Sequence, residues 1–475
     1  MVFSSYEFLL IFLPIVLVGY YLLSRLKNEL YPRLYLIAAS LFFYAYQNVK
    51  YVVLILLSIA VNYLIACGIQ RSEKKRAKLL LVLGILFNVF LIGYYKYYNF
   101  FIENINLVAR TDFTLKHILL PLGISFYTFQ QLSFLVSIYN NEEKVERLRD
   151  YSLFVLFFPQ LVAGPIVLYS EMIPQFKEPQ RRFFNAENFA AGLYIFAIGL
   201  FKKAVIADTL CVLVDNGFAM TDLSLSAAWA TSLSYTLQIY FDFSGYSDMA
   251  VGLGKMFNID LPFNFLSPYR AESITEFWRK WHVTLGRALS TYVYKPLGGN
   301  RNGLTRTCVN LFITFMVSGF WHGASWTFIF WGALHGLCIV IERITAKQRN
   351  AIPRAIRVFV TFMIVNALWV LFRAEGIAQA MEIYRGMLAF GNLGLAQLNT
   401  VVGYTANLNF PVMVDIAYTI GMLGLLLGIV FCCKNSAVKL KNYTPTTTSL
   451  MGAALLFSVA LLCLSRESVF IYFNF

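Results

Sequence analysis

Histidine is the side chain in this sequence best suited to acid–base chemistry, and the 475 residues contain only four histidines. An imidazole titrates near neutral pH, so it can take a proton from an attacking hydroxyl group and return it to a leaving group. His322 follows an apolar run in "VSGFWHGASWTFIFWGALHG", directly after Trp321. The glycines around it would leave room for a substrate, but a structural histidine hydrogen-bonded between two helices would show the same pattern.

The stretch "FWRKWHVTLGRALSTYVYKPLGGNR" gathers charge within an apolar chain and holds the second candidate, His282. Helical spacing would place Trp278 and Arg279 one turn before His282. Arg279 would then be able to orient an anionic group. The alternative is an interfacial aromatic belt in which the cations contact lipid headgroups.

His335 lies 13 residues after His322. On one continuous helix the two side chains would be about 220° apart around the axis and roughly 20 Å apart along it. Both cannot serve one reaction centre unless the helix breaks near Gly323. We therefore expect His335 to be structural, and we expect His117, at the head of an apolar segment, to be interfacial.

Polar side chains also interrupt the apolar run "LQIYFDFSGYSDMAVG", which contains Gln238, Asp242 and Asp248. Carboxylates inside a membrane are costly unless they have partners. Asp242 could orient a histidine, or it could form a buried polar contact between helices. The sequence contains no phosphate-binding loop, no dinucleotide fingerprint and no metal triad, so any chemistry must rest on histidine, carboxylate and backbone groups.

The composition indicates the elements that must position these residues. Only 13% of the residues are charged and 59% are hydrophobic, whereas about a quarter of a soluble domain is charged. We predict an all-α polytopic membrane protein with one domain over 1–475 and roughly 10 to 13 membrane-embedded helices. The candidate spans are 6–24, 33–48, 51–70, 79–97, 117–139, 151–170, 189–213, 225–256, 307–322, 325–342, 358–373, 412–432 and 446–465.

Two groups of segments depart from simple spans. Internal proline and glycine in 117–139 and 151–170 predict broken or re-entrant helices, which are tolerated where the backbone is buried in protein or faces water. Segment 257–306 is too polar for a lipid-exposed helix and is expected to form interfacial or re-entrant helices. The seven cysteines show no spacing typical of a metal site or a disulfide framework.

The net charge of +14 is concentrated in short loops between apolar runs, at 25–27, 71–78, 342–357 and 434–442. This distribution follows the positive-inside rule and points to anionic lipid rather than nucleic acid as the counter-charge. The basic loops are therefore predicted to be cytoplasmic. The first apolar segment is predicted to be a retained helix with the N-terminus outside. The stretch 374–411 and the C-terminus are also predicted to be extracytoplasmic.

Several motifs together resemble the membrane-bound O-acyltransferase family. They are "FWRKWHVTL", "PLGGNR", "GFWHGASWTFIFWGALHG", "LPLGISFYTFQQLSF", "FFPQLVAGPI", "YFDFSGYSDMAVGLGKMFNIDLPFNFLSPYRA" and the terminal "FIYFNF". They extend over the whole chain and are similar to the bacterial polysaccharide-modifying branch, which includes the membrane subunit of alginate O-acetylation. Relatives commonly carry Arg-Asp where this chain has Ser290 and Thr291, so the acceptor sugar is not carried over from alginate.

The resemblance implies helices around a tunnel that joins the cytoplasmic side to an external funnel. It implies that His322 is catalytic, that His282 lines the same tunnel, and that the His322 imidazole sits in a hydrated passage. A hydrogen-bond donor for the developing oxyanion would come from His282, Asn300 or backbone N–H groups. The remaining candidates for lining the tunnel or contacting substrate are Gln238, Asp242, Trp278, Arg279, Asn300, Trp321 and His335.

The implied activity is transfer of an acyl group, in the first instance acetyl, across a bacterial cytoplasmic membrane. The donor would be a cytoplasmic thioester, acetyl-CoA or an acyl-carrier protein, with no permanently bound cofactor and no metal. The acceptor would be a hydroxyl of an exported or cell-surface polysaccharide, reached directly or through an extracytoplasmic SGNH-type partner. The alternatives are a D-alanyl transferase for teichoic acid that uses a carrier-protein thioester, and a transporter, whose inverted repeats are not found here.

Overall fold

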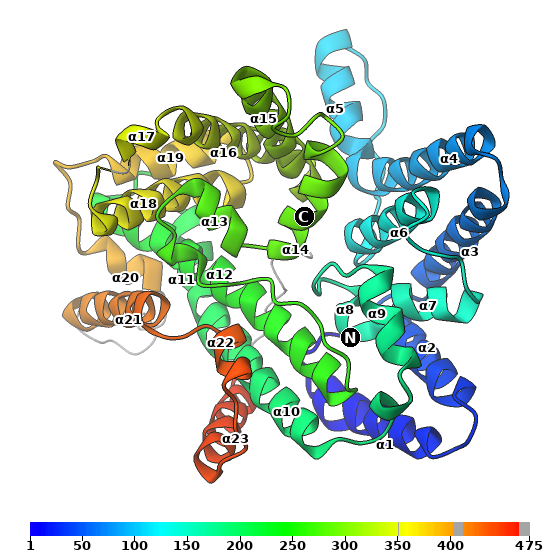
Figure 1. The fold of residues 1–475 in the computed structure, drawn as a ribbon. Helices are drawn as coiled ribbons and strands as arrows, with labels where there is room; N and C mark the ends of the chain where they lie inside the picture. Colours follow the sequence, from blue (N-terminus) through cyan, green and yellow to red (C-terminus); the bar gives the residue numbers. More distant parts are fainter. Residues whose placement is uncertain (350, 403–411, 465–475) are drawn as a thin grey trace. The chain divides into compact units, whose positions relative to one another are not determined.

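The computed structural model describes residues 1–349, 351–402 and 412–464, and every regular element within these ranges is helical, as Figure 1 shows. This confirms the predicted all-α class. The C-terminal stretch 466–475, predicted to be extracytoplasmic, lies outside the described residues. The chain forms two compact units, each built from separate stretches of sequence, and the single domain over 1–475 stays a prediction.

Unit 1 comprises Met1–Ile198, Tyr246–Phe263 and Tyr443–Leu464. Its elements are η1 (Glu7–Phe12), α1 (Leu13–Ser24), α2 (Leu30–Ala45), α3 (Val49–Arg71), α4 (Lys74–Ile92), η2 (Gly93–Tyr97), α5 (Tyr98–Ala109), α6 (Ile124–Tyr139), α7 (Leu148–Leu156), α8 (Phe158–Leu161), α9 (Tyr169–Lys177), η3 (Pro179–Arg182), most of α10 (Ala186–Phe201), the end of α12 (Leu225–Met256) and α23 (Thr447–Leu462).

Unit 2 comprises Gly199–Gly245 and Asn264–Asn442 among the described residues. Its elements are the end of α10, η4 (Lys202–Ala207), α11 (Asp208–Ala219), most of α12, η5 (Pro268–Arg270), α13 (Ile274–Lys280), α14 (Val283–Leu289), η6 (Ser290–Tyr294), α15 (Gly303–His322), α16 (Trp326–Ile344), α17 (Ala346–Arg349), α18 (Arg354–Arg373), α19 (Ile377–Met387), α20 (Gln397–Val402), α21 (Val412–Cys432) and α22 (Ser436–Lys441).

Seven of the described helices are long and apolar enough to cross a bilayer, which confirms a polytopic membrane protein. They are Glu7–Ser24, Val49–Arg71, Lys74–Ala109, Gly303–His322, Trp326–Ile344, Arg354–Arg373 and Val414–Cys432, with shorter apolar helices at Leu30–Ala45 and Thr447–Leu462. The larger number of embedded helices predicted from the sequence included broken segments. Which of those lie inside the bilayer stays a prediction.

The two segments with internal proline and glycine are indeed broken. In 117–139 the helix begins only at Ile124, after Gly123 with φ 71°. A Cβ on Gly123 would lie 2.7 Å from the Leu161 carbonyl oxygen, so close backbone packing also requires glycine there. In 151–170 the helix stops at Leu156, restarts with Pro159 near its first position, and stops again at Leu161. These breaks follow the expected positions of proline in helices.

Amide side chains join three helices inside unit 1. Asn62 of α3 donates to Gln131 of α6 at 2.7 Å, and Asn88 of α4 donates to Asn62 at 2.7 Å. All three side chains are buried. Since lipid offers no hydrogen bonds, such contacts between apolar helices fix which faces meet.

In unit 2, α15 and α16 form an antiparallel hairpin with very close backbones. A Cβ on Gly319 would lie 2.4 Å from the Phe328 carbonyl oxygen, and one on Gly332 would lie 2.5 Å from that of Phe315. Only glycine permits this approach. The helix breaks at Gly323, as the sequence suggested, and Ser325 caps α16 by accepting a hydrogen bond from the Thr327 N–H. This break determines where the two hairpin histidines lie.

Candidate active site

His322 is the last residue of α15 and its imidazole is enclosed by aromatic rings. The ring centroid lies 5.0 Å from that of Trp321, 5.2 Å from Trp331 and 5.2 Å from Phe372. The residue is 3% exposed. The expectation of an imidazole bathed in an open hydrated passage is therefore wrong for this structure, because packed rings separate it from solvent.

His282 does not continue the helix that carries Trp278 and Arg279. Helix α13 ends at Lys280, and His282 adopts the left-handed conformation with φ 44° before α14 begins. The turn is held from both sides, since the Trp281 N–H donates to the Phe277 carbonyl and the Val283 N–H donates to the Asn264 carbonyl. The expected one-turn spacing between Arg279 and His282 is therefore wrong.

The turn directs His282 toward the same tryptophan that His322 contacts. The His282 ring is buried, 4.8 Å from the Phe243 ring and 6.2 Å from the Trp321 ring. Left-handed backbone at a residue other than glycine is uncommon and tends to occur at functional sites. The structure thus brings the two predicted histidines, from α15 and from the start of α14, against one indole.

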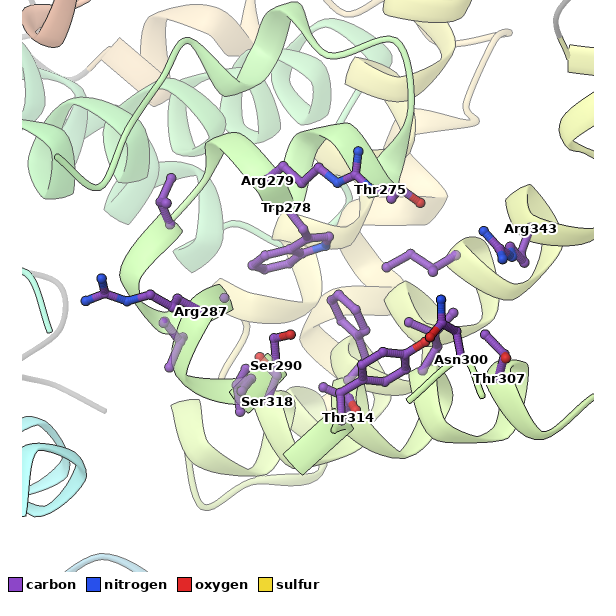
Figure 2. A pocket seen from close by; sticks show the side chains of 18 residues that line it. Thr275, Trp278, Arg279, Arg287, Ser290, Asn300, Thr307, Thr314, Ser318 and Arg343 are labelled. Carbon is purple, nitrogen blue, oxygen red and sulfur yellow. The ribbon is translucent and has the colours of Figure 1, made fainter. Parts of the chain in front are cut away.

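Unit 2 contains a pocket of about 560 Å³ (Figure 2). It is lined by Thr275, Trp278, Arg279, Val283, Leu285, Gly286, Arg287, Leu289, Ser290, Tyr294, Asn300, Thr307, Leu311, Thr314, Phe315, Ser318, Ile339 and Arg343. Of the predicted site residues, Trp278, Arg279 and Asn300 line it. His282, His322, Trp321, His335, Gln238 and Asp242 do not.

Arginines lie at both ends of the pocket. In Figure 2, Arg287 is on the left, Arg343 and Asn300 are on the right, and Trp278 lies between them. Hydroxyl groups of Thr307, Thr314 and other residues lie along the lower wall of the same view. The lining is apolar over most of its area and carries several guanidinium and hydroxyl groups, which suits an elongated ligand with anionic groups and an apolar part.

One face of α15 leads from this pocket to His322. Thr307, Leu311, Thr314 and Ser318 line the pocket and are spaced three or four residues apart, so they share one face of the helix. His322 follows Ser318 by one more turn, or about 6 Å along the axis. Val283, the residue after His282, also lines the pocket. His322 therefore lies one helical turn beyond a lining residue, and His282 directly precedes a lining residue in the sequence.

Trp278 lines the pocket and contacts Trp331, which in turn contacts His322. The Trp278 indole N–H donates to Nδ1 of His335 at 3.2 Å. Trp331 contacts Trp278 at 5.5 Å between centroids, His335 at 4.8 Å and His322 at 5.2 Å. Because Nδ1 of His335 accepts, its neutral ring carries the proton on Nε2. This arrangement agrees with a structural role for His335, which holds Trp278 in place.

Asp242 has a lysine as its partner. Its Oδ1 lies 2.7 Å from Nζ of Lys203, which also lies 2.9 Å from Asp208, and all three side chains are buried. The neighbouring Gln238 is buried on the same helix, α12. Asp242 is thus part of a buried ion-pair cluster, and the hypothesis that it orients a histidine stays a prediction. Two lysines in "FKKAV", inside the predicted span 189–213, could have indicated such a partner for the carboxylate.

Sequence reasoning also missed the polar stripe on α15 and the position of Arg343 in the pocket lining. Thr314 and Ser318 precede His322 at intervals of four residues, a pattern visible within the apolar run. Ser290, one of the two residues at which the sequence is expected to depart from the family motif, lines the pocket.

Known proteins place this helical membrane site in a class. A family model described as MBOAT, membrane-bound O-acyltransferase family, matches residues 147–373. The chain is 42% identical to the peptidoglycan O-acetyltransferase of Helicobacter pylori over 514 aligned residues, covering 100% of this chain and 98% of that protein. It is 42% identical to the probable alginate O-acetylase AlgI of Pseudomonas aeruginosa, over 84% of this chain and 77% of that protein.

A more distant relative is the teichoic acid D-alanyltransferase of Streptococcus thermophilus, 25% identical over 53% of this chain and 68% of that protein. The fold and these matches define an integral membrane acyltransferase rather than a transporter. The chain belongs to the membrane-bound O-acyltransferase family.

Proposed function

We propose that this enzyme transfers an acetyl group from a cytoplasmic thioester to a hydroxyl of an exported or cell-surface polysaccharide, with His322 as general base. The observation that carries the proposal is the continuous face of α15 that leads from the pocket to His322. Peptidoglycan is the first acceptor to test, because the relative named for it matches over the full length of both chains. Alginate is the acceptor named for the second group of relatives.

The pocket supports a thioester donor whose carrier bears phosphate groups. Its volume of about 560 Å³ falls within the usual range for small-molecule sites. From Thr307 to Ser318 it follows α15 for about 17 Å, which suits an extended arm. In this proposal Arg279 and Arg343 bind the phosphates, and the thioester reaches the Ser318 end, beside His322.

The orientation of the chain supports donor entry from the cytoplasm. Arg343 lies near the end of α16, at the start of the basic loop 342–357 that the positive-inside rule places in the cytoplasm. The pocket end marked by Arg343 and Asn300 then faces the cytoplasm of a bacterial inner membrane. The N-terminus lies outside, and an SGNH-type partner on that side receives the acyl group or completes the transfer.

The chemistry needs only groups of this chain and the two substrates. The acceptor oxygen attacks the thioester carbonyl carbon while His322 takes the hydroxyl proton. The carbon–sulfur bond then breaks, and the imidazolium returns the proton to the thiolate. His282 donates to the carbonyl oxygen as negative charge develops, since Asn300 lies at the opposite, Arg343 end of the pocket. Trp321, Trp331 and Phe372 around His322 exclude water that would otherwise hydrolyse the thioester. A shift of Trp278 and Trp331 opens the way from the pocket to the imidazole.

The direct test uses membrane vesicles from cells that express the chain together with its glycan. Acetyl-CoA labelled in the acetyl group is supplied to the cytoplasmic face. We expect base-labile label on the glycan polymer. Label from a D-alanyl carrier protein and none from acetyl-CoA would instead support the teichoic acid activity, and label from neither would overturn the proposal.

A further inference from the structure

Unit 1 contains a second cavity, of about 590 Å³, that no part of the proposed reaction uses. Its walls come from η1, α1, α10, the end of α12 and α23, with Leu13, Val18, Phe196 and Phe457 among the lining residues. Every lining residue except Tyr21 and Arg25 is apolar. The cavity is therefore an apolar groove with one cationic end.

The groove has the length of a lipid chain. From Leu13 to Arg25 it follows α1 for about 18 Å, which is more than half of a hydrocarbon core of about 30 Å. Helix α1 lies in a candidate membrane span. Val18 on the groove is 60% exposed and Leu22 is 55% exposed. In a membrane, surfaces of this kind face lipid and not water.

The cationic end carries more positive charge than Arg25 alone. Lys27 follows two residues later in the sequence, and Arg182 reaches the same turn, donating to the Leu26 carbonyl at 3.4 Å. The nearest carboxylate in sequence, Glu29, is paired with Arg33 at 2.9 Å. Within the part of the chain that the structure describes, neither Arg25 nor Lys27 has an ion pair. This end therefore attracts a phosphate group.

We propose that the groove binds one glycerophospholipid with a net negative headgroup. One acyl chain lies along α1, from Arg25 toward Leu13, and the phosphate is held by Arg25 and Arg182. Charge complementarity favours this occupant over a protein helix, because an apolar helix would leave the three cations unpaired. The site is independent of the proposed reaction and would be present whatever the acceptor.

The test measures lipid binding to the purified full-length protein by native mass spectrometry, with phosphatidylglycerol and phosphatidylethanolamine offered at equal concentration. We expect the unmodified protein to retain phosphatidylglycerol at least fivefold over phosphatidylethanolamine. Val18→Trp, which fills the groove from its exposed side, should lose both lipids. Arg25→Gln should keep binding but lose the preference for the anionic lipid.

Matched controls come from α3. The Val53 side chain is 70% exposed. Arg71 is the last residue of α3, and Arg25 directly follows the last residue of α1, so both arginines lie at a helix C-terminus. Val53→Trp and Arg71→Gln should bind lipid as the unmodified protein does. Equal retention of the two lipids by the unmodified protein would overturn the proposal. An unchanged preference for phosphatidylglycerol in Arg25→Gln would also overturn the proposal. This second result can be read even if Val18→Trp does not fold.

Discussion

The two cavities are almost the same size, about 560 and 590 Å³, but their linings differ in kind. The pocket in unit 2 has three arginines, an asparagine and a row of hydroxyl groups, and a histidine lies one helical turn beyond it. The groove in unit 1 has one arginine at the end of an apolar wall. Volume therefore does not distinguish a reaction site from a lipid site. The two cavities differ in the polar groups that line them and in whether a histidine lies next to the lining.

Filling each cavity with a bulky side chain should have the largest difference in effect on acetyl transfer. Thr314→Trp occupies the pocket and prevents the thioester from reaching His322, so acetyl transfer should fall about 100-fold, the usual cost of displacing a reacting group. Val18→Trp should leave transfer within about twofold of the unmodified enzyme. The measurement is the initial rate of labelled acetyl transfer in membrane vesicles. Equal losses in the two variants would mean that the pocket has no special role.

A smaller effect is expected when charges are removed from each cavity. Arg343→Gln and Arg279→Gln should each raise KM for acetyl-CoA about tenfold, since a charge-assisted hydrogen bond contributes about 1.5–3 kcal/mol. kcat should change little, because the phosphates are remote from the reacting carbonyl. Arg25→Gln should leave KM unchanged. If Arg343→Gln lowers kcat and leaves KM constant, Arg343 does not bind the donor.

The smallest effect on acetyl transfer is expected when the hydrogen bond between Trp278 and His335 is removed. His335→Leu removes the acceptor for the Trp278 indole N–H, a hydrogen bond that contributes about 1 kcal/mol. Transfer should fall about fivefold, with KM affected more than kcat. His335→Gln, which keeps an acceptor, should recover most of the loss. A complete loss of activity in His335→Gln at unchanged protein level would instead assign His335 a direct role in the chemistry.

Much of this architecture was predictable because it depends on local properties of the chain. The helix break at Gly323 and the interruptions around Gly123 and Pro159 follow from the backbone preferences of glycine and proline. The hairpin that carries His322 follows from two apolar runs on either side of that break. The spacing argument for a structural His335 assumed one continuous helix, so with the break at Gly323 the structural role of His335 stays a prediction.

The site itself was less predictable, because it depends on contacts between distant segments. The left-handed turn at His282 is held by Asn264, a residue that no local pattern connects to it. Lys203 pairs with Asp242 across 39 positions of sequence, and either a histidine or a lysine would have satisfied that carboxylate. Burial of both imidazoles arises from aromatic packing that a list of candidate residues does not reveal.

If His322 is the base reached from the pocket, replacing it should cost far more activity than replacing a histidine elsewhere in the chain. The measurement is the rate of labelled acetyl transfer by His322→Gln and by His117→Gln, each in membrane vesicles with matched amounts of inserted protein. His117 is an exposed histidine outside the site and serves as the control. We expect His322→Gln to lose about 1,000-fold in rate, within the range for removal of a general base, and His117→Gln to stay within about twofold. If His322→Gln retains more than a tenth of the rate, His322 is not the general base.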